Sequence, residues 1–117
     1  MRHLERALHT TVAKYLDAAL PAAAYWFPVP NASIRNIAQA ANMKRAGELK
    51  PGVPDIFIIH SGRAIGVELK VGKAKPTTNQ VTAHESITLA GGIVATVNSL
   101  DALYYFLSQI ISLKARP

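Results

Sequence analysis

Apolar residues recur along this chain with two different periods, which predict its helices and strands. Helical spacing recurs in residues 3–20, in 34–46, from Thr77 or Thr78 to the Gly91-Gly92 pair, and in 100–111. Short runs rich in β-branched and aromatic side chains are typical of strands and occupy residues 24–29, 56–59, 64–69 and 93–97. The order helix, strand, helix, hairpin, helix, strand, helix predicts one α/β domain over 1–117, a mixed β-sheet flanked by helices.

The two central apolar runs flank a Ser-Gly turn signal at 61–62, which predicts a β-hairpin. A symmetric loop pairs Ile58 with Ile65, and the same register puts Asp55 opposite Glu68. Side chains alternate along a strand, so Glu68 and Lys70 share one face, and Asp55 joins them as the cross-strand partner of Glu68.

The predicted register brings two acidic side chains together in almost wholly apolar strands. Carboxylates about 5 Å apart destabilise a sheet unless positive charge lies between them. A divalent cation with the nearby ammonium of Lys70 answers that requirement, so Asp55 and Glu68 are candidate metal ligands. Hard oxygen ligands favour Mg²⁺ or Mn²⁺ over zinc.

Composition narrows the class of protein. Half of the 117 residues are apolar, which excludes a disordered chain, and the absence of cysteine excludes disulfides and thiolate metal sites. The apolar stretch 18–30 contains three prolines and is too short to span a bilayer, so we expect no membrane partner and a cytoplasmic location. The net charge of +6 favours a polyanionic partner, most commonly nucleic acid.

The basic residues gather before and after the predicted hairpin. Each is a candidate to contact DNA phosphates and position the duplex without reading its sequence. A purely solubilising role is the alternative for each of them. The residues are Arg35, Lys44, Arg45, Lys50, Lys73 and Lys75.

Pro54-Asp55 followed by Glu68-Leu69-Lys70 resembles the signature of the PD-(D/E)xK nuclease superfamily, whose fold is restriction-endonuclease-like. Within it, the chain resembles the VRR-NUC domain (virus-type replication-repair nuclease) in its standalone phage or bacterial form. The likeness covers roughly residues 3–99. Further positions match in order and spacing, namely Pro30-Asn31, Arg35, Gly47, Pro51-Gly52-Val53, Gln80 and Gly92-Ile93-Val94.

The resemblance implies a role for each matching residue. Asp55 and Glu68 would bind the metal with help from the Leu69 carbonyl, and Lys70 would orient the attacking water and stabilise developing charge. Glu5 matches an acidic residue that completes the metal shell, directly or through water.

Three residues keep a second interpretation. Glu5 also suits the dipole of the first helix. Gln80 matches a glutamine close to the active site, and it also completes a capping-box pattern with Thr77. His84 stands where the family more often has an aromatic or apolar residue, and it either faces DNA or is a partly buried structural histidine.

The resemblance therefore implies a divalent-metal-dependent DNA endonuclease, a Holliday-junction (four-way junction) resolvase that acts as a homodimer. The exposed half of the helix at 103–111 or the strand Tyr25-Trp26-Phe27 would supply the interface. A nuclease for flaps, nicks or duplex ends is the alternative within the same fold. A non-catalytic basic DNA-binding module and a small basic structural protein are alternatives outside the enzyme class.

Overall fold

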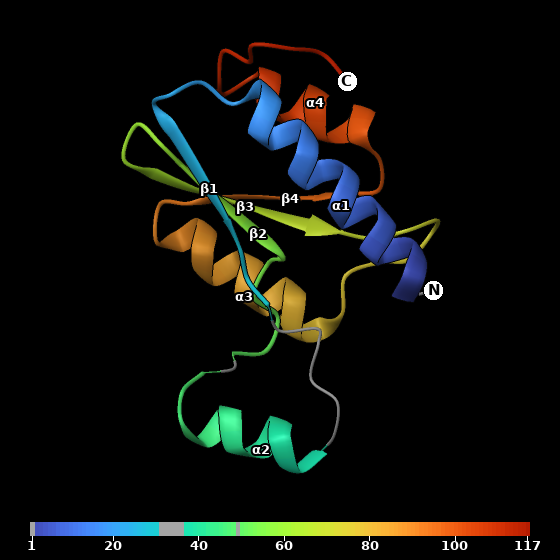
Figure 1. Cartoon of the computed structure of the whole chain (residues 1–117). Coiled ribbons are helices and arrows are strands. Elements are labelled where there is room, and N and C mark those ends of the chain that lie inside the picture. The colour runs from blue at the N-terminus through green and yellow to red at the C-terminus, as the bar shows by residue number, and fades with distance from the viewer. Residues whose placement is uncertain (1, 31–36, 49) are drawn as a thin grey trace.

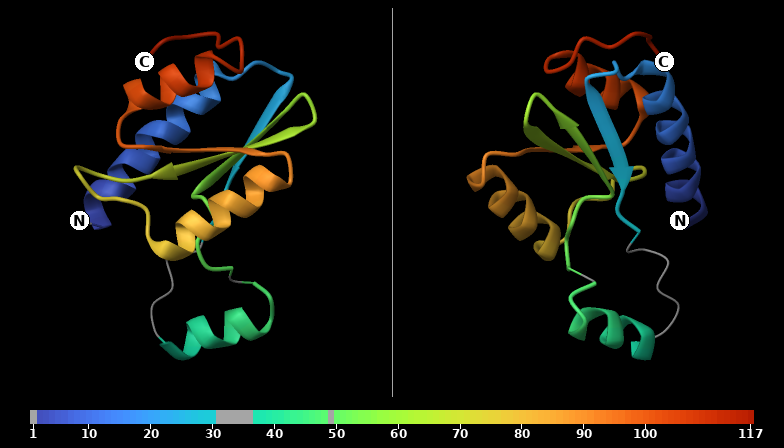
Figure 2. Two further views of the ribbon diagram at one scale, coloured as in Figure 1. Left: turned by 180° about the vertical axis from the view of Figure 1, so that it is seen from behind. Right: turned by 60° about the vertical axis from the view of Figure 1, so that its left-hand side comes forward.

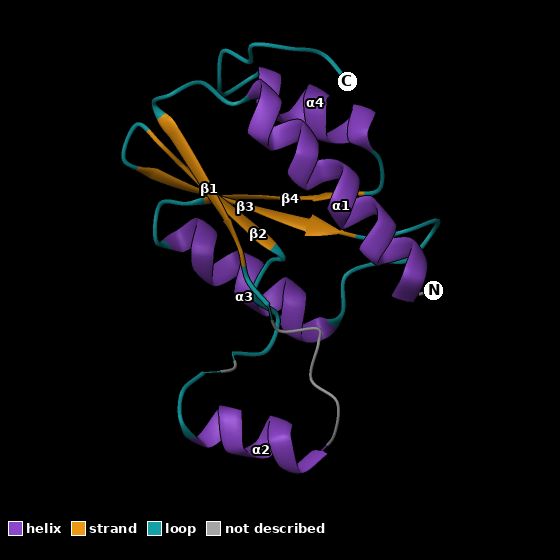
Figure 3. Cartoon of the chain, in the orientation of Figure 1, coloured by secondary structure: helices purple, strands orange, loops and turns teal. Residues whose placement is uncertain are grey.

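The computed structural model describes residues 2–30, 37–48 and 50–117, and it has the predicted order of elements (Figures 1 and 3). The helices are α1 (Arg2–Ala19), α2 (Ile37–Arg45), α3 (Thr78–Leu89) and α4 (Leu100–Ser108). The strands are β1 (Ala24–Pro28), β2 (Ile56–His60), β3 (Arg63–Leu69) and β4 (Ile93–Val97). None of the described helices combines the length and the hydropathy needed to cross a membrane.

The four strands form a mixed sheet in the order β1-β2-β3-β4. The β1–β2 and β2–β3 pairs are antiparallel, whereas β3 and β4 are parallel, so the predicted mixed α/β fold is confirmed. β1 is an edge strand, where Pro28 at its end removes no hydrogen bond from the interior of the sheet.

The hairpin has the predicted register. Ile58 pairs with Ile65, and the ladder continues to Ile56 opposite Val67. Positive φ angles of 53° at Ser61 and 74° at Gly62 match the two central residues of a type I′ turn, whose twist suits a two-residue hairpin loop.

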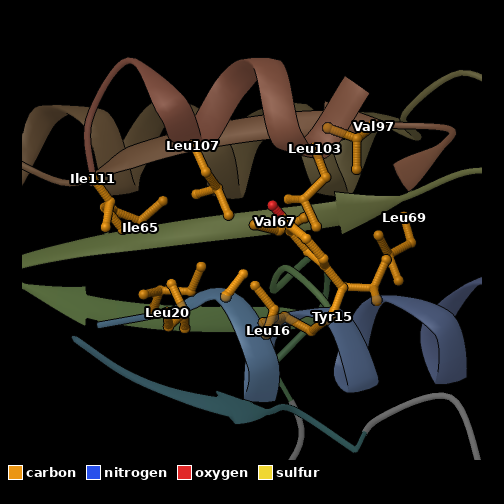
Figure 4. Packing of buried hydrophobic residues seen from close by; sticks show 14 residues of the cluster. Tyr15, Leu16, Leu20, Ile65, Val67, Leu69, Val97, Leu103, Leu107 and Ile111 are labelled. Atoms are coloured by element: carbon orange, nitrogen blue, oxygen red, sulfur yellow. The ribbon is translucent and has the colours of Figure 1, made fainter. Parts of the chain in front are cut away.

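Helices cover the two faces of the sheet unequally. α1 and α4 pack on one face and α3 lies on the other (Figure 2). The hydrophobic core lies under α1 and α4, as Figure 4 shows. Its fully buried side chains are Val12, Leu16, Ala19, Ile56, Ile58, Ile65, Val67, Leu103 and Leu107.

The last helix is shorter than its apolar stripe. α4 ends at Ser108, not at Ile111 as predicted, and the chain turns back with Ile111 still 3% exposed against the core. Leu103, Leu107 and Ile111 are buried within the same chain, whereas Tyr105 in the same segment is 68% exposed, so the interface on the exposed half of 103–111 stays a prediction.

α2 projects away from the rest of the protein (Figures 1 and 2). It ends as predicted at Gly47, whose φ of 77° is left-handed. The N–H of Glu48 donates to the Met43 carbonyl, as in a Schellman motif. Arg35 and the predicted first turn at 34–36 lie outside the described residues.

Gly52 brings the loop before β2 against the first turn of α3. Its φ of 82° is left-handed, and a Cβ built there would lie 2.1 Å from the Asn79 backbone oxygen. Only glycine meets both conditions. Gly52 therefore fixes the start of α3 relative to the carboxylates.

We expect Gly52→Ala to lower the free energy of unfolding by roughly 1–3 kcal/mol from backbone strain alone, and further through the clash with Asn79. The matched control is Gly72→Ala, because Gly72 also has a positive φ, 59°, but a Cβ added there would have nothing within 4 Å. Urea unfolding of both variants measures the difference. An equal loss of unfolding free energy in the two variants would show that the contact between Gly52 and α3 contributes nothing to stability.

Candidate active site

Asp55 lies one residue before β2 and is held from both neighbouring strands. Its backbone carbonyl accepts from the N–H of Val29 at 2.8 Å, and its Oδ2 accepts from the N–H of Leu69 at 2.7 Å. The preceding Pro54 is buried against Gly66, where a Cβ would come within 2.9 Å of the proline ring. The Val-Pro-Asp segment is therefore held in place by the packing of Pro54 against Gly66, where β3 has no side chain.

Glu68 is the only buried charged side chain among the described residues, with 2% of its surface exposed. The hairpin register extended by one step places it opposite Asp55, as predicted. Burial, the negative charge of Asp55 and a hydrogen bond with the Asp55 side chain raise the pKa of Glu68 from 4.5 to about 9, although the ammonium of Lys70 opposes this shift. In the absence of a cation, Glu68 therefore holds a proton at neutral pH.

Gln80 unites its two predicted roles. Its Oε1 accepts from the Thr77 N–H at 2.8 Å while its own N–H donates to Thr77 Oγ1 at 3.3 Å, which completes the capping box of α3. Its Nε2 donates to Glu68 Oε2 at 3.1 Å. One side chain thus caps the helix with its oxygen and orients the buried carboxylate with its nitrogen.

His84 also faces Glu68, from one turn further along α3. Its Nε2 lies 3.5 Å from Glu68 Oε1, and both atoms are buried without a hydrogen-bond partner. Burial and the positive charge of Lys70 lower the pKa of His84, so the ring is neutral at neutral pH. The sequence predicted that His84 either faces DNA or is partly buried. Its side chain is partly buried, 17% exposed, and lies beside Glu68.

Glu5 and Lys70 lie close enough to act on Glu68 through their charges. Lys70 lowers and Glu5 raises the pKa of Glu68, which brings the first turn of α1 and the end of β3 to the same region (Figure 1). The Leu69 N–H points to Asp55, and in an extended strand the carbonyl of the same residue points to the same side. The candidate ligand oxygen of Leu69 is therefore directed to the Asp55 side of β3.

The basic residues that are candidates to bind DNA, and that the structure describes, are all exposed and lie in two segments of the chain. Lys44 and Arg45 end α2, with Lys50 following, and the Arg45 guanidinium donates to the Asn42 side chain. Lys73 and Lys75 occupy the loop between β3 and α3, at the end of the sheet that carries Glu68 (Figure 1). Arg35 lies outside the described residues.

The carboxylates fit a hard divalent cation. Glu68 Oε1 is a buried oxygen with no partner, and Asp55 lies beside it. Among the residues that the structure describes, no three His, Asp or Glu side chains gather closely enough to enclose a metal ion. Two carboxylates suffice for Mg²⁺, which commonly keeps several waters and takes its remaining ligands from substrate phosphates.

The sequence matches no protein-family model and no curated protein. Among solved structures, a "VRR_NUC domain protein" superimposes with a TM-score of 0.66 at 20% sequence identity, over 90% of this chain and 85% of that chain. The chain has the VRR-NUC fold. A structural likeness at 20% sequence identity establishes the fold alone.

Proposed function

We propose that the chain is a divalent-metal-dependent DNA endonuclease that hydrolyses phosphodiester bonds. The observation that carries this proposal is the buried carboxylate of Glu68, paired with Asp55 and flanked by Lys70. Maintaining an unsatisfied buried carboxylate is costly and is typical of functional sites. The VRR-NUC fold supports a nuclease activity. The hard oxygen ligands favour Mg²⁺ or Mn²⁺ as the cation.

In this mechanism Asp55 and Glu68 would hold the cation, the Leu69 carbonyl would add an oxygen, and Glu5 would act on the shell through a water. When bound, the cation polarises a phosphoryl oxygen and makes a bound water more acidic. Lys70 provides a fixed positive charge where negative charge develops on the phosphate, which stabilises the transition state. Gln80 keeps the carboxylate of Glu68 oriented through its 3.1 Å hydrogen bond.

The exposed basic residues would bind the DNA backbone. Lys73 and Lys75 follow the candidate site directly, and Lys44, Arg45 and Lys50 lie in or after the projecting α2. Phosphate contacts of this kind position the duplex and make affinity fall with salt, without sequence preference. We assign Arg35 to the same group on its position in the sequence.

The substrate that we propose is branched DNA, with a four-way junction as the main candidate and a homodimer as the active form. Two active sites related by a two-fold axis suit a substrate that is itself symmetric. Flaps, nicks and duplex ends are the alternative substrates of the same chemistry.

The decisive experiment incubates the protein with labelled four-way junction, flap and linear duplex in Mg²⁺, Mn²⁺ or EDTA. We expect cutting only with metal, and paired symmetric nicks across the junction. Lys70→Met keeps the aliphatic chain and removes the charge, and should lower kcat by roughly 10²–10³-fold. Lys73→Met, three residues on and exposed, is the matched control and should change mainly DNA affinity.

The outcomes separate the alternatives. Cutting that survives EDTA would refute the metal-dependent mechanism. Binding without cutting would identify a DNA-binding module, and unpaired cuts in flaps or duplex ends would identify the alternative nuclease. A protein that neither binds nor cuts DNA would fit a structural role.

The dimer interface is expected on the exposed aromatic residues of β1. Tyr25 and Phe27 are 70% and 37% exposed, whereas Trp26 is half-buried and its Nε1 donates to Asp17 at 2.7 Å. We expect a double substitution, Tyr25→Ser with Phe27→Ser, to convert dimers to monomers in sedimentation and to replace paired nicks by single nicks. Tyr105→Ser is the control, since this tyrosine is 68% exposed on α4 and should leave the dimer intact.

A further inference from the structure

The buried carboxylate of Glu68 has two oxygens in different states. Oε2 accepts a hydrogen bond from Gln80 Nε2 at 3.1 Å, and Oε1 has no partner. The side chain of His84 faces Oε1, and its Nε2, which is 3.5 Å away, also has no partner. Two buried polar atoms that face each other without a hydrogen bond are rare in proteins and require an explanation.

Gln80 and His84 both belong to α3, whose position is fixed at its N-terminal end. They are four residues apart on α3, so they lie on one face of the helix. The capping box at Thr77 and the close approach of Gly52 fix that helix end against the loop before β2. A shift of a few tenths of an ångström would bring Nε2 and Oε1 into hydrogen-bond distance.

We propose that His84 is a positioning residue that donates its Nε2–H to Glu68 Oε1 when Glu68 serves as a cation ligand, so that α3 holds both oxygens of this ligand. A carboxylate has about four acceptor sites, so two hydrogen bonds still leave room for a metal. Hydrogen bonds in empty active sites are often long and tighten only in the working complex. The inference rests on the proposed function, since it gives Glu68 the role of a metal ligand.

The structure also explains why His84 acts through Glu68 and not on the cation itself. No three His, Asp or Glu side chains among the described residues form one coordination group, so His84 does not join both Asp55 and Glu68 around a single metal position. Partners that orient a metal-binding carboxylate typically contribute 10–100-fold, as a rough range, to metal affinity.

The test measures binding of Mg²⁺, Mn²⁺ and Ni²⁺ to the full chain by calorimetry. We expect His84→Leu to weaken all three by a similar factor, on the order of 10–100-fold. His84→Gln retains an N–H donor and should recover part of that loss. Glu85→Gln, the exposed neighbour on α3, is the control and should bind like the wild type.

Two further readouts distinguish positioning from a structural role. Metal-free His84→Leu should melt no lower than the wild type, because it removes one of two unpaired buried atoms, whereas its stabilisation by metal should shrink. In ¹⁵N NMR, addition of Mg²⁺ should leave His84 protonated on Nε2.

Each outcome decides a different point. Equal metal affinity in wild type and His84→Leu would overturn the positioning role while leaving the proposed nuclease intact. A loss confined to Ni²⁺ would overturn it too, because a nitrogen ligand, unlike a positioning residue, favours that ion. A wild type that binds no divalent cation would refute the proposed function itself.

Discussion

Asp55→Asn is expected to abolish metal-dependent DNA cleavage while making the metal-free protein more stable above pH 9, where Glu68 is ionised. Asparagine keeps the shape and an oxygen that can accept from the Leu69 N–H, so the 2.7 Å hydrogen bond to β3 can persist. It removes the negative charge beside buried Glu68, which is a main cause of the raised pKa there. The same charge is needed to hold a cation, so the two effects have opposite signs.

The expected loss of metal affinity in Asp55→Asn follows from the role of Asp55 as a direct ligand. Loss of an outer-shell partner weakens metal binding by roughly 10–100-fold, and loss of a ligand should exceed that range. Single-turnover cleavage of the four-way junction measures the first effect, and thermal unfolding in EDTA above pH 9 measures the second.

Asp101→Asn is the matched control, because this exposed aspartate lies in the first turn of α4. It should leave cleavage unchanged and lower stability slightly, through the lost interaction with the helix dipole. An Asp55→Asn variant that cuts DNA normally would refute the assignment of Asp55. A variant that cannot cut and is also less stable without metal would indicate a structural role for the carboxylate.

The sequence predicted the hairpin part of the site well, because that part depends on local rules. A two-residue loop and the alternation of side chains suffice to bring Asp55 opposite Glu68, and the structure confirms that register. The edge position of β1 and the end of α2 at Gly47 likewise follow from single residues with restricted backbones.

The contribution of α3 to the site was harder to predict. This helix has no buried residue, so no clear apolar face indicated how it lies on the sheet. The four-residue spacing of Gln80 and His84 showed only that they share a face. That this face meets Glu68 depends on Gly52 and on the packing of α3 against β4, which are long-range contacts.

The end of α4 was mispredicted for a related reason. Apolar spacing continues to Ile111, but the helix stops at Ser108 and the chain buries Ile111 from a turn. Periodicity reports which side chains are buried and does not by itself report where the backbone stops being helical.

The stability of the metal-free protein is expected to fall steadily as the pH rises from 6.5 to 9. The pKa of Glu68 is about 9 in the folded protein against 4.5 for an ordinary glutamate, so the folded state binds one more proton than the unfolded state between these values. The free energy of unfolding therefore decreases with pH in this window. This contribution is complete below pH 4.5 and is lost as the pH passes through about 9.

His84 acts in the opposite sense but in a different range. Its pKa is lowered from 6.5, so the unfolded state binds the extra proton and stability rises with pH only up to about that value. Above pH 6.5, Glu68 is left as the main shifted group of this site.

A divalent cation should reverse the trend, because it replaces the proton on Glu68. Metal affinity should increase with pH across the same window, since the carboxylate must be ionised to bind. Thermal unfolding at half-unit intervals, in EDTA and in saturating Mn²⁺, measures both slopes. Glu68→Gln is the control, because a neutral amide should flatten the pH dependence in EDTA and remove the stabilisation by Mn²⁺. A wild-type melting temperature that is constant from pH 6.5 to 9 in EDTA would show that Glu68 is already ionised without metal, and the like-charge argument for this site would then fail.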